Sequence, residues 1–233
     1  RSTQTILKRW AASYLSEFGL PYRIPVGDWS TLLEIVSDLD LEGDRSDEIT
    51  RLRWGSFFRW VLRVSRPDGS PMWTTPGRDP RRKRWLLNWA RWLDDRAARR
   101  VLSWWYPREA RPQDLEEPPF LPAAADSQSG LAVLRANWLG SGDWLAVDPG
   151  GSDSGFGLEL GVRGRPWLGP SWCWDTAERP GRVRLSHWSS TWRADVAEWT
   201  LRLGADRIVR TAVLARDQGL ALLGEEVEVR GPR

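Results

Sequence analysis

The spacing of apolar residues changes once along this chain, and that change limits what the chain can fold into. From residue 3 to residue 105, apolar side chains recur every three or four positions, as in the stripe of Ile6, Trp10 and Tyr14. This is the period of an amphipathic helix. Pro21 follows the first stripe and is expected to end that helix. The pattern predicts four or five helices with short connections, packed as a bundle or as part of a helical toroid.

Capping residues and turns divide this first region. Asp28 and Ser46 each precede an apolar stripe, and Asp79 is followed by Pro80. These are residues that favour the first positions of a helix. A Pro-Asp-Gly sequence at 67–69 predicts a turn between two helices. We therefore expect a helical domain over residues 1–106.

Residues 107–128 are rich in proline, which favours a linker or a segment lying along the surface. Beyond them the apolar period becomes two, and glycine turns separate short runs. That pattern is typical of an antiparallel β-sandwich, expected over residues 129–233. The chain stops at Arg233, just after an expected strand. The sandwich is therefore expected either to be complete or to lack its closing strands. The fold class is then α+β, with strands at 131–136, 144–147, 156–162, 196–203, 207–215 and 220–229.

Histidine and cysteine are nearly absent from the chain. His187 and Cys173 are the only examples in 233 residues, and most metal sites and nucleophilic mechanisms need such side chains. We expect no metal site, no cofactor and no catalytic residue in this chain. Residues 150–157 are glycine-rich but lack the Lys-Ser/Thr pair of a phosphate loop, so nucleotide binding is not expected.

The charge balance is modest. The formal net charge is +3, with +4 over residues 1–118 and −1 over residues 119–233. Neither half has the dense positive field of a nucleic-acid binder, so no nucleic-acid partner is expected. The sequence contains no apolar run long enough to span a membrane. It leaves the cellular compartment and the oligomeric state open.

A series of short motifs in the second half resembles the heparinase II/III-like family. The matching segments are residues 130–135, 144–151, 156–160 and 164–168, followed by Arg210, Val213 and Leu214 and by the strand that runs from Leu220 into Glu225 and Glu226. The resemblance covers about residues 129–229. It implies a helical toroid followed by a β-sandwich, and an acidic polysaccharide as the partner.

The chain departs from this family where catalysis would be expected. The family carries a His-x-His-x-Asp cluster in the loop that reads Gly-Ser-Asp-Ser-Gly at 151–155 here. It also uses tyrosine together with histidine, but Tyr14, Tyr22 and Tyr106 all lie far from His187 in the sequence. We therefore expect a catalytically degenerate protein with a polysaccharide-binding or structural role. Two alternatives stay open: a fragment of an active uronate lyase whose catalytic residues lie outside this chain, and a tryptophan-rich protein-interaction domain.

Tryptophan supplies most of the candidate binding residues. The chain has 18 tryptophans, and those on helical stripes are expected in the core. Indole rings on strands and loops can stack on sugars if one face is open to solvent. Residues 79–84 form the densest basic run, interpreted as a solvated helix face or as a patch for an acidic glycan. The candidate binding residues are Trp188, Trp192, Arg193, Trp138, Trp144 and His187.

Overall fold

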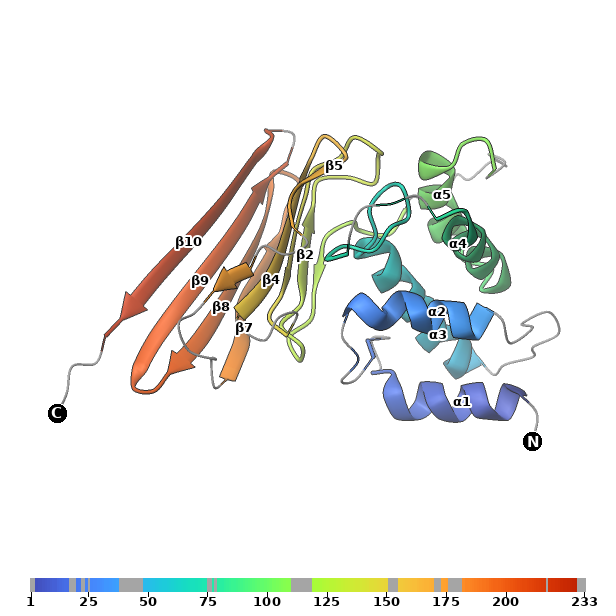
Figure 1. Cartoon of the computed structure of the whole chain (residues 1–233), viewed down its shortest axis with the longest axis horizontal. Helices are drawn as coiled ribbons and strands as arrows, with labels where there is room; N and C mark the ends of the chain where they lie inside the picture. Colours follow the sequence, from blue (N-terminus) through green and yellow to red (C-terminus); the bar gives the residue numbers. More distant parts are fainter. Residues whose placement is uncertain are drawn as a thin grey trace. The chain divides into compact units, whose positions relative to one another are not determined.

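The chain divides into two compact units in a computed structural model (Figure 1). One unit comprises Arg1–Pro71 and Pro76–Phe120, and the other Met72–Thr75 and Leu121–Arg233. The structure describes residues 3–16, 20–21, 24, 26–37, 48–74, 77, 79–109, 119–150, 155–169, 173–175, 182–216 and 218–229. The predicted boundaries at residues 106 and 129 stay a prediction, and residues 110–118 of the proline-rich segment lie outside the described part.

The first unit is helical, as the three-and-four spacing predicts. Its elements are α1 (Thr3–Tyr14), a 3₁₀ turn (Val26–Asp28), α2 (Trp29–Ser37), α3 (Glu48–Arg63), α4 (Pro80–Trp92) and α5 (Arg96–Trp105). The predicted cap of α4 is confirmed, since the Asp79 carboxylate accepts the backbone N–H of Arg81 at 2.9 Å. Asp95 caps α5 in the same way, accepting the N–H of Ala98 at 2.9 Å.

Aromatic side chains fill the interior of the helical unit. Trp54 and Trp89 are each 1% exposed, and their ring centroids lie 5.4 Å apart. Phe58 stacks on Trp89 at 5.9 Å, and Trp10 stacks on Trp54 at 5.5 Å. Such large apolar groups each contribute about 1.5–3 kcal/mol when fully buried. Trp29, Trp60 and Trp89 are buried in the core, as their spacing predicts, whereas Trp10, Trp85 and Trp92 are half-buried.

The second unit is built from two antiparallel sheets (Figure 1). In the first sheet the strand order is β1-β2-β3-β4-β5, and β6 also pairs with β4. In the second sheet the order is β10-β9-β8-β7. The predicted α+β fold is confirmed, and residues 194–229 hold strands rather than a helix. The strands are β1 (Ala124–Ala125), β2 (Ala132–Arg135), β3 (Trp144–Asp148), β4 (Gly155–Val162), β5 (Arg165–Leu168), β6 (Cys173–Asp175), β7 (Arg182–Ser190), β8 (Ala194–Leu203), β9 (Asp206–Ala215) and β10 (Leu220–Glu228).

Alternating side chains of both sheets form the sandwich core. On β8 the buried positions are Ala197, Trp199 and Leu201, and on β9 they include Ala212 and Leu214. They pack with side chains of β2, β3 and β4 in one buried cluster. Because successive strand residues point to opposite faces, the period of two in the sequence marks this inner face.

The strand β7 was not predicted, and its register explains why. Its pairing with β8 shifts between Leu185 and His187, so an extra residue interrupts the strict alternation of faces. Val183, Leu185 and Trp188 pack against the core, at spacings of two and then three. A search for a period of two therefore misses this strand.

Candidate anion-binding pocket

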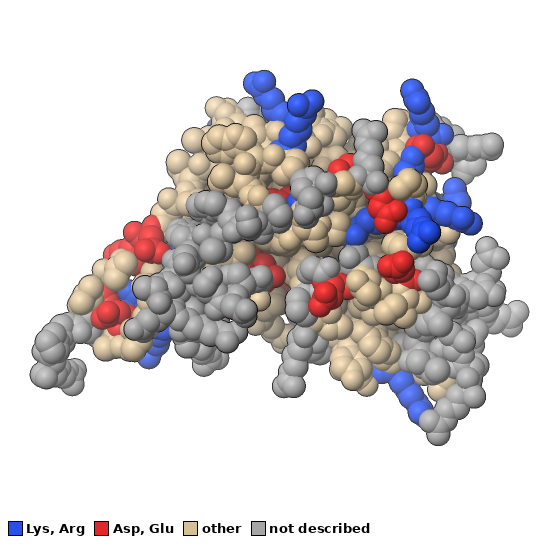
Figure 2. Space-filling model, viewed as in Figure 1, with Lys and Arg blue, Asp and Glu red and all other residues tan. Residues whose placement is uncertain are grey.

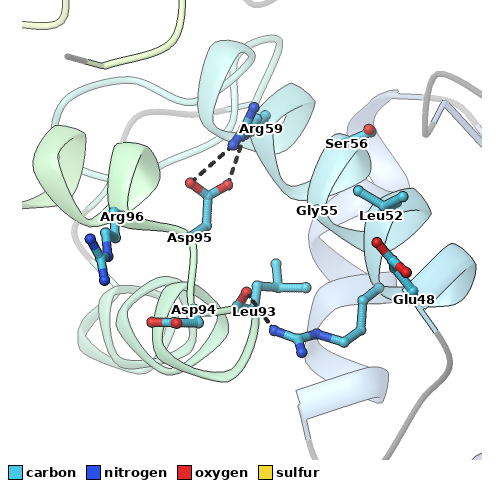
Figure 3. A pocket seen from close by; sticks show the side chains of 10 residues that line it. Glu48, Leu52, Gly55, Ser56, Arg59, Leu93, Asp94, Asp95 and Arg96 are labelled. Atoms are coloured by element: carbon cyan, nitrogen blue, oxygen red, sulfur yellow. Dashed lines mark hydrogen bonds and ion pairs between the residues drawn. The ribbon is translucent and has the colours of Figure 1, made fainter. Parts of the chain in front are cut away.

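A polar pocket lies between α3 and the turn that joins α4 to α5 (Figure 3). Its volume is about 750 Å³. It is lined from α3 by Glu48, Arg51, Leu52, Gly55, Ser56 and Arg59, and from the turn by Leu93, Asp94, Asp95 and Arg96. The α3 positions recur every three or four residues, so they share one face of the helix. At Gly55 an added Cβ atom would meet nothing within 4 Å, which leaves the floor of the pocket open.

The turn between α4 and α5 fixes the second wall. Asp94 has a φ of 51°, a left-handed conformation that aspartate tolerates better than most residues. This conformation reverses the chain within two residues and leaves Asp95 at the cap of α5. Both carboxylates are thereby placed at the edge of the pocket by backbone geometry.

Arg59 is held on two sides. Its Nε and Nη2 atoms donate to Asp95 at 2.8 and 3.3 Å, and its guanidinium lies 5.5 Å from the centre of the Phe120 ring. Arg63 lies over the same ring at 4.9 Å. Burial, together with the nearby charge of Arg59, lowers the pKa of Arg63 to about 10. Arg63 is not part of the lining, so Arg59 is the guanidinium that this side contributes to the pocket.

The charged side chains that line the pocket do not fully neutralise one another. Asp95 is paired with Arg59, and Asp94 with Arg99 at 2.8 Å, so neither carboxylate is available to the other arginines. Arg51 donates to the backbone oxygen of Leu93 at 3.2 Å, which leaves donors for a ligand. Within the described part of the chain, Arg96 makes no hydrogen bond or ion pair. Of the carboxylates that line the pocket, Glu48 alone is unpaired among the described residues.

The surrounding sequence is strongly basic. Residues 48–105 contain fourteen Lys and Arg but only five Asp and Glu. Figure 2 shows Lys and Arg side chains gathered where α4 and α5 lie, with a few acidic side chains among them. Sequence reasoning missed Arg51, Arg59 and Arg96, because the net charge summed over residues 1–118 is only +4 and hides the local excess of positive charge. A count over the span from α3 to α5 would have found this region.

Two of the predicted binding residues, Trp138 and Trp144, are buried at 2% and 0% exposure. The Arg135 guanidinium lies 4.9 and 5.8 Å from their ring centres. Trp144 donates from Nε1 to Glu159 at 3.2 Å. Neither ring presents an open face to a ligand, and both contribute to the interior of the sandwich unit.

His187 and Trp188 lie on opposite faces of β7. His187 is exposed and pairs in register with Glu198 on the outer face. Trp188 pairs in register with Ala197 and packs against the core. The two side chains are therefore not brought together. Trp188 is an extension of the core rather than an open platform.

Trp192 and Arg193 are brought together in the turn between β7 and β8. Trp192 is 76% exposed, and the Arg193 guanidinium lies 4.4 Å from the centre of its ring. Asp195 follows on β8 but is fully buried and accepts from Arg216 at 2.6 Å. Trp192 and Arg193 are therefore both accessible to a ligand.

Within the described ranges, no group of three or more His, Cys, Asp or Glu residues could hold a metal ion. The glycine-rich loop at 151–154 and the side chain of Cys173 lie outside the described part. No helix among the described residues is long and apolar enough to cross a membrane.

Comparison with solved structures identifies the architecture. A structure of heparinase III superposes with a TM-score of 0.74 and 11% sequence identity, covering 96% of this chain and 40% of that one. The fold resembles that of part of the heparinase III chain. A second heparinase III structure, with methylated lysines, gives a TM-score of 0.72 and 13% identity over the same shares of the two chains. The expected structural resemblance is thus confirmed, and the chain spans about two fifths of the heparinase III chain. No family model and no curated protein matches the sequence.

Proposed function

We propose that this chain binds an acidic polysaccharide through the pocket between α3 and the α4–α5 turn, without lyase chemistry of its own. The observation that carries the proposal is the pair Arg51 and Arg96, which line one pocket with Glu48 as the only unpaired carboxylate among its described lining residues. Heparinase III, which shares the fold, is named for heparin, an acidic polysaccharide.

The chemistry of the pocket suits carboxylate or sulfate groups. A guanidinium offers several N–H donors in a planar fork that matches both groups. The volume of about 750 Å³ lies within the range of ligand pockets and is large enough for more than one sugar ring. Arg59 would serve as a fixed positive charge, because Asp95 and Phe120 already orient it.

The proposed absence of lyase chemistry is supported by the distribution of acid–base side chains. His187 lies in the sandwich unit on the exposed outer face of β7. Burial raises the pKa of Tyr106 above its ordinary value, which disfavours that phenol as a base near neutral pH.

Calorimetric titration with size-defined heparin oligosaccharides and with uncharged dextran oligosaccharides tests the proposal. Heparin should bind and dextran should not. Arg51→Ala and Arg96→Ala should each weaken heparin binding about tenfold, the effect of losing one charge-assisted hydrogen bond. Arg202→Ala, which removes an exposed arginine of β8 in the sandwich unit, is the matched control and should change little. Equal affinities in all four proteins would reject the pocket.

The catalytic part has a separate test. Incubation of the chain with heparin and with non-sulfated uronate polysaccharides should give no new ultraviolet absorbance from an unsaturated sugar. Turnover that persists after repeated purification would show that the chain is a lyase.

A second candidate function, docking of a partner protein, is favoured by β10. Leu220, Leu222, Leu223 and Val227 on this edge strand are between 39% and 53% exposed. Apolar side chains gathered on an edge strand are typical of interaction surfaces. Sedimentation analysis that shows a monomer with and without Leu222→Lys and Val227→Lys would argue against self-association through this edge.

A further inference from the structure

A second, smaller pocket lies in the sandwich unit and has a different chemistry. Its volume is about 330 Å³, and residues of both sheets line it. Leu160 of β4 and Trp167 of β5 come from the first sheet, and Leu214 of β9 and Leu220 of β10 come from the second. Asp143, just before β3, supplies the one charged side chain among the described residues of the lining.

Trp167 gives this pocket an accessible aromatic wall. It lies on β5, at one end of the first sheet, and is 73% exposed. Leu220, which also lines the pocket, is 47% exposed. Most large apolar side chains of this unit are buried in the core, so an indole left open beside a cavity is available to a ligand.

Asp143 is fixed by the backbone around it. Its Oδ1 atom accepts the N–H of Arg163 at 2.7 Å. Arg163 and Gly164 have φ values of 50° and 75°, the left-handed pair of a tight hairpin turn. The N–H of Gly164 in turn donates to the carbonyl oxygen of Gly142 at 3.2 Å. The loop and the turn therefore hold the carboxylate in one orientation.

The second oxygen of Asp143 is left for a ligand. Oδ2 lies 4.0 Å from the position that a Cβ atom would take on Gly219, another residue of the lining. Among the described residues, no hydrogen bond is made to this atom. A carboxylate oxygen accepts and does not donate, so it selects a ligand that carries hydroxyl or N–H donors.

We propose that this pocket binds one neutral pyranose residue, with its C–H face on the Trp167 ring and a hydroxyl donating to Asp143. The volume lies at the small end of the range for ligand pockets, which suits a single ring. The described lining residues include no Lys, Arg or His, and Asp143 would repel a sugar acid. The site goes beyond acidic-polysaccharide binding by the helical unit and does not rest on it.

Saturation-transfer NMR and calorimetric titration of the whole chain test the site with methyl β-D-glucoside and methyl β-D-glucuronide. These two ligands differ only by the carboxylate at C6. The glucoside should bind with a millimolar dissociation constant, and the glucuronide at least about tenfold more weakly. Trp167→Ala should weaken glucoside binding by about tenfold or more. Leu139→Ala, at an exposed apolar side chain of the same unit outside the pocket, should leave it unchanged.

Asp143→Asn tests the polar contact separately. Asparagine keeps an acceptor for the Arg163 N–H, so the fold should be retained, and thermal unfolding checks this. The variant should lose affinity for the glucoside and lose the discrimination against the glucuronide. The inference is overturned if the glucoside does not bind, or if it binds equally to the natural chain and to Trp167→Ala. It is also overturned if an apolar dye occupies the pocket and the glucoside fails to displace it.

Discussion

In the helical unit, Arg51 and Arg96 are exposed and line an open pocket, whereas in the sandwich unit Arg135 and Arg210 are each only 1% exposed. Arg210 pairs with Glu225 at 2.7 Å and lies over the Phe156 ring at 4.9 Å. Arginine thus provides hydrogen-bond donors for a ligand in the helical unit and contacts within the interior in the sandwich unit. A count of arginines in a sequence does not separate these two uses.

Burial carries an electrostatic cost that the exposed arginines do not have. Desolvation lowers the pKa of Arg135 to about 9, and the nearby carboxylate of Glu159 opposes that shift. Because a charge removed from water needs a compensating partner, Arg135 depends on Glu159. The pocket arginines have no such dependence, since solvent remains available to them. The two regions should therefore respond differently when a partner is removed.

The largest effect is expected from Glu159→Ala. Glu159 is fully buried and accepts the N–H of Trp73 at 2.8 Å and the Nε1–H of Trp144 at 3.2 Å. Its removal leaves the Arg135 charge buried, so the free energy of unfolding should fall by about 3–5 kcal/mol. Urea unfolding followed by circular dichroism measures this.

The control for this prediction is Glu228→Ala. Glu228 pairs with Arg207 at 3.8 Å, and both side chains are about half exposed. Removing an exposed pair should change stability by less than about 1 kcal/mol. Equal losses of stability in Glu159→Ala and Glu228→Ala would contradict the expected difference between a buried and an exposed carboxylate.

Gly161 and Gly55 extend the comparison to packing. An added Cβ atom at Gly161 would overlap the ring of Trp144, its partner on β3, so Gly161→Ala should destabilise the sandwich unit by about 1–3 kcal/mol. At Gly55 in α3 the same methyl meets open space, and Gly55→Ala should stabilise the helix by about 0.5–1 kcal/mol. Urea unfolding should show a lower free energy of unfolding for Gly161→Ala and a higher one for Gly55→Ala. A change of the same sign in both variants would contradict the packing around Trp144.

The fold was predictable because its main signal is local. A period of three and four, or of two, depends only on which face of an element meets the core. The bulge near Ser186 hid β7, because one extra residue breaks the period. The pockets were not predictable in this way. Arg51 and Arg96 are 45 positions apart in the sequence, and only the packing of α3 against the α4–α5 turn brings them to one cavity.

The exposure of individual tryptophans was likewise not predictable from the sequence. Trp144 and Trp167 both lie on strands of the first sheet, yet one is fully buried and the other is 73% exposed. Their surroundings differ through distant residues: Glu159 and Arg135 enclose Trp144, while β5 has a strand on one side only. Residue type and local spacing do not encode which ring is covered.

A smaller loss of stability is expected for Asp95→Ala, and heparin binding should not be lost with it. Asp95→Ala removes the cap of α5 and should cost about 1–2 kcal/mol. It also frees the Arg59 guanidinium in the pocket, so heparin oligosaccharides should bind as well as before or more tightly. Asp79→Ala is the control, because it removes the cap of α4 outside the pocket and should lower stability without changing binding. A loss of heparin affinity in Asp95→Ala would mean that binding depends on Asp95 holding the Arg59 guanidinium in place.

The smallest effect concerns Asp148, at the end of β3. Burial raises the pKa of this carboxyl, and the N–H of Gly150, donating to it at 3.0 Å, opposes part of the shift. Since the folded state then holds its proton to higher pH than the unfolded chain, ionisation of Asp148 lowers stability as the pH rises through this interval. Asp148→Asn keeps an acceptor for Gly150 and removes the charge, so its melting temperature should exceed that of the natural chain at pH 7. The difference should vanish below about pH 3.9, the ordinary pKa of aspartate, because both side chains are then neutral. Thermal unfolding at the two pH values measures this, and a variant less stable than the natural chain at pH 7 would show that the Asp148 charge is compensated in the folded state.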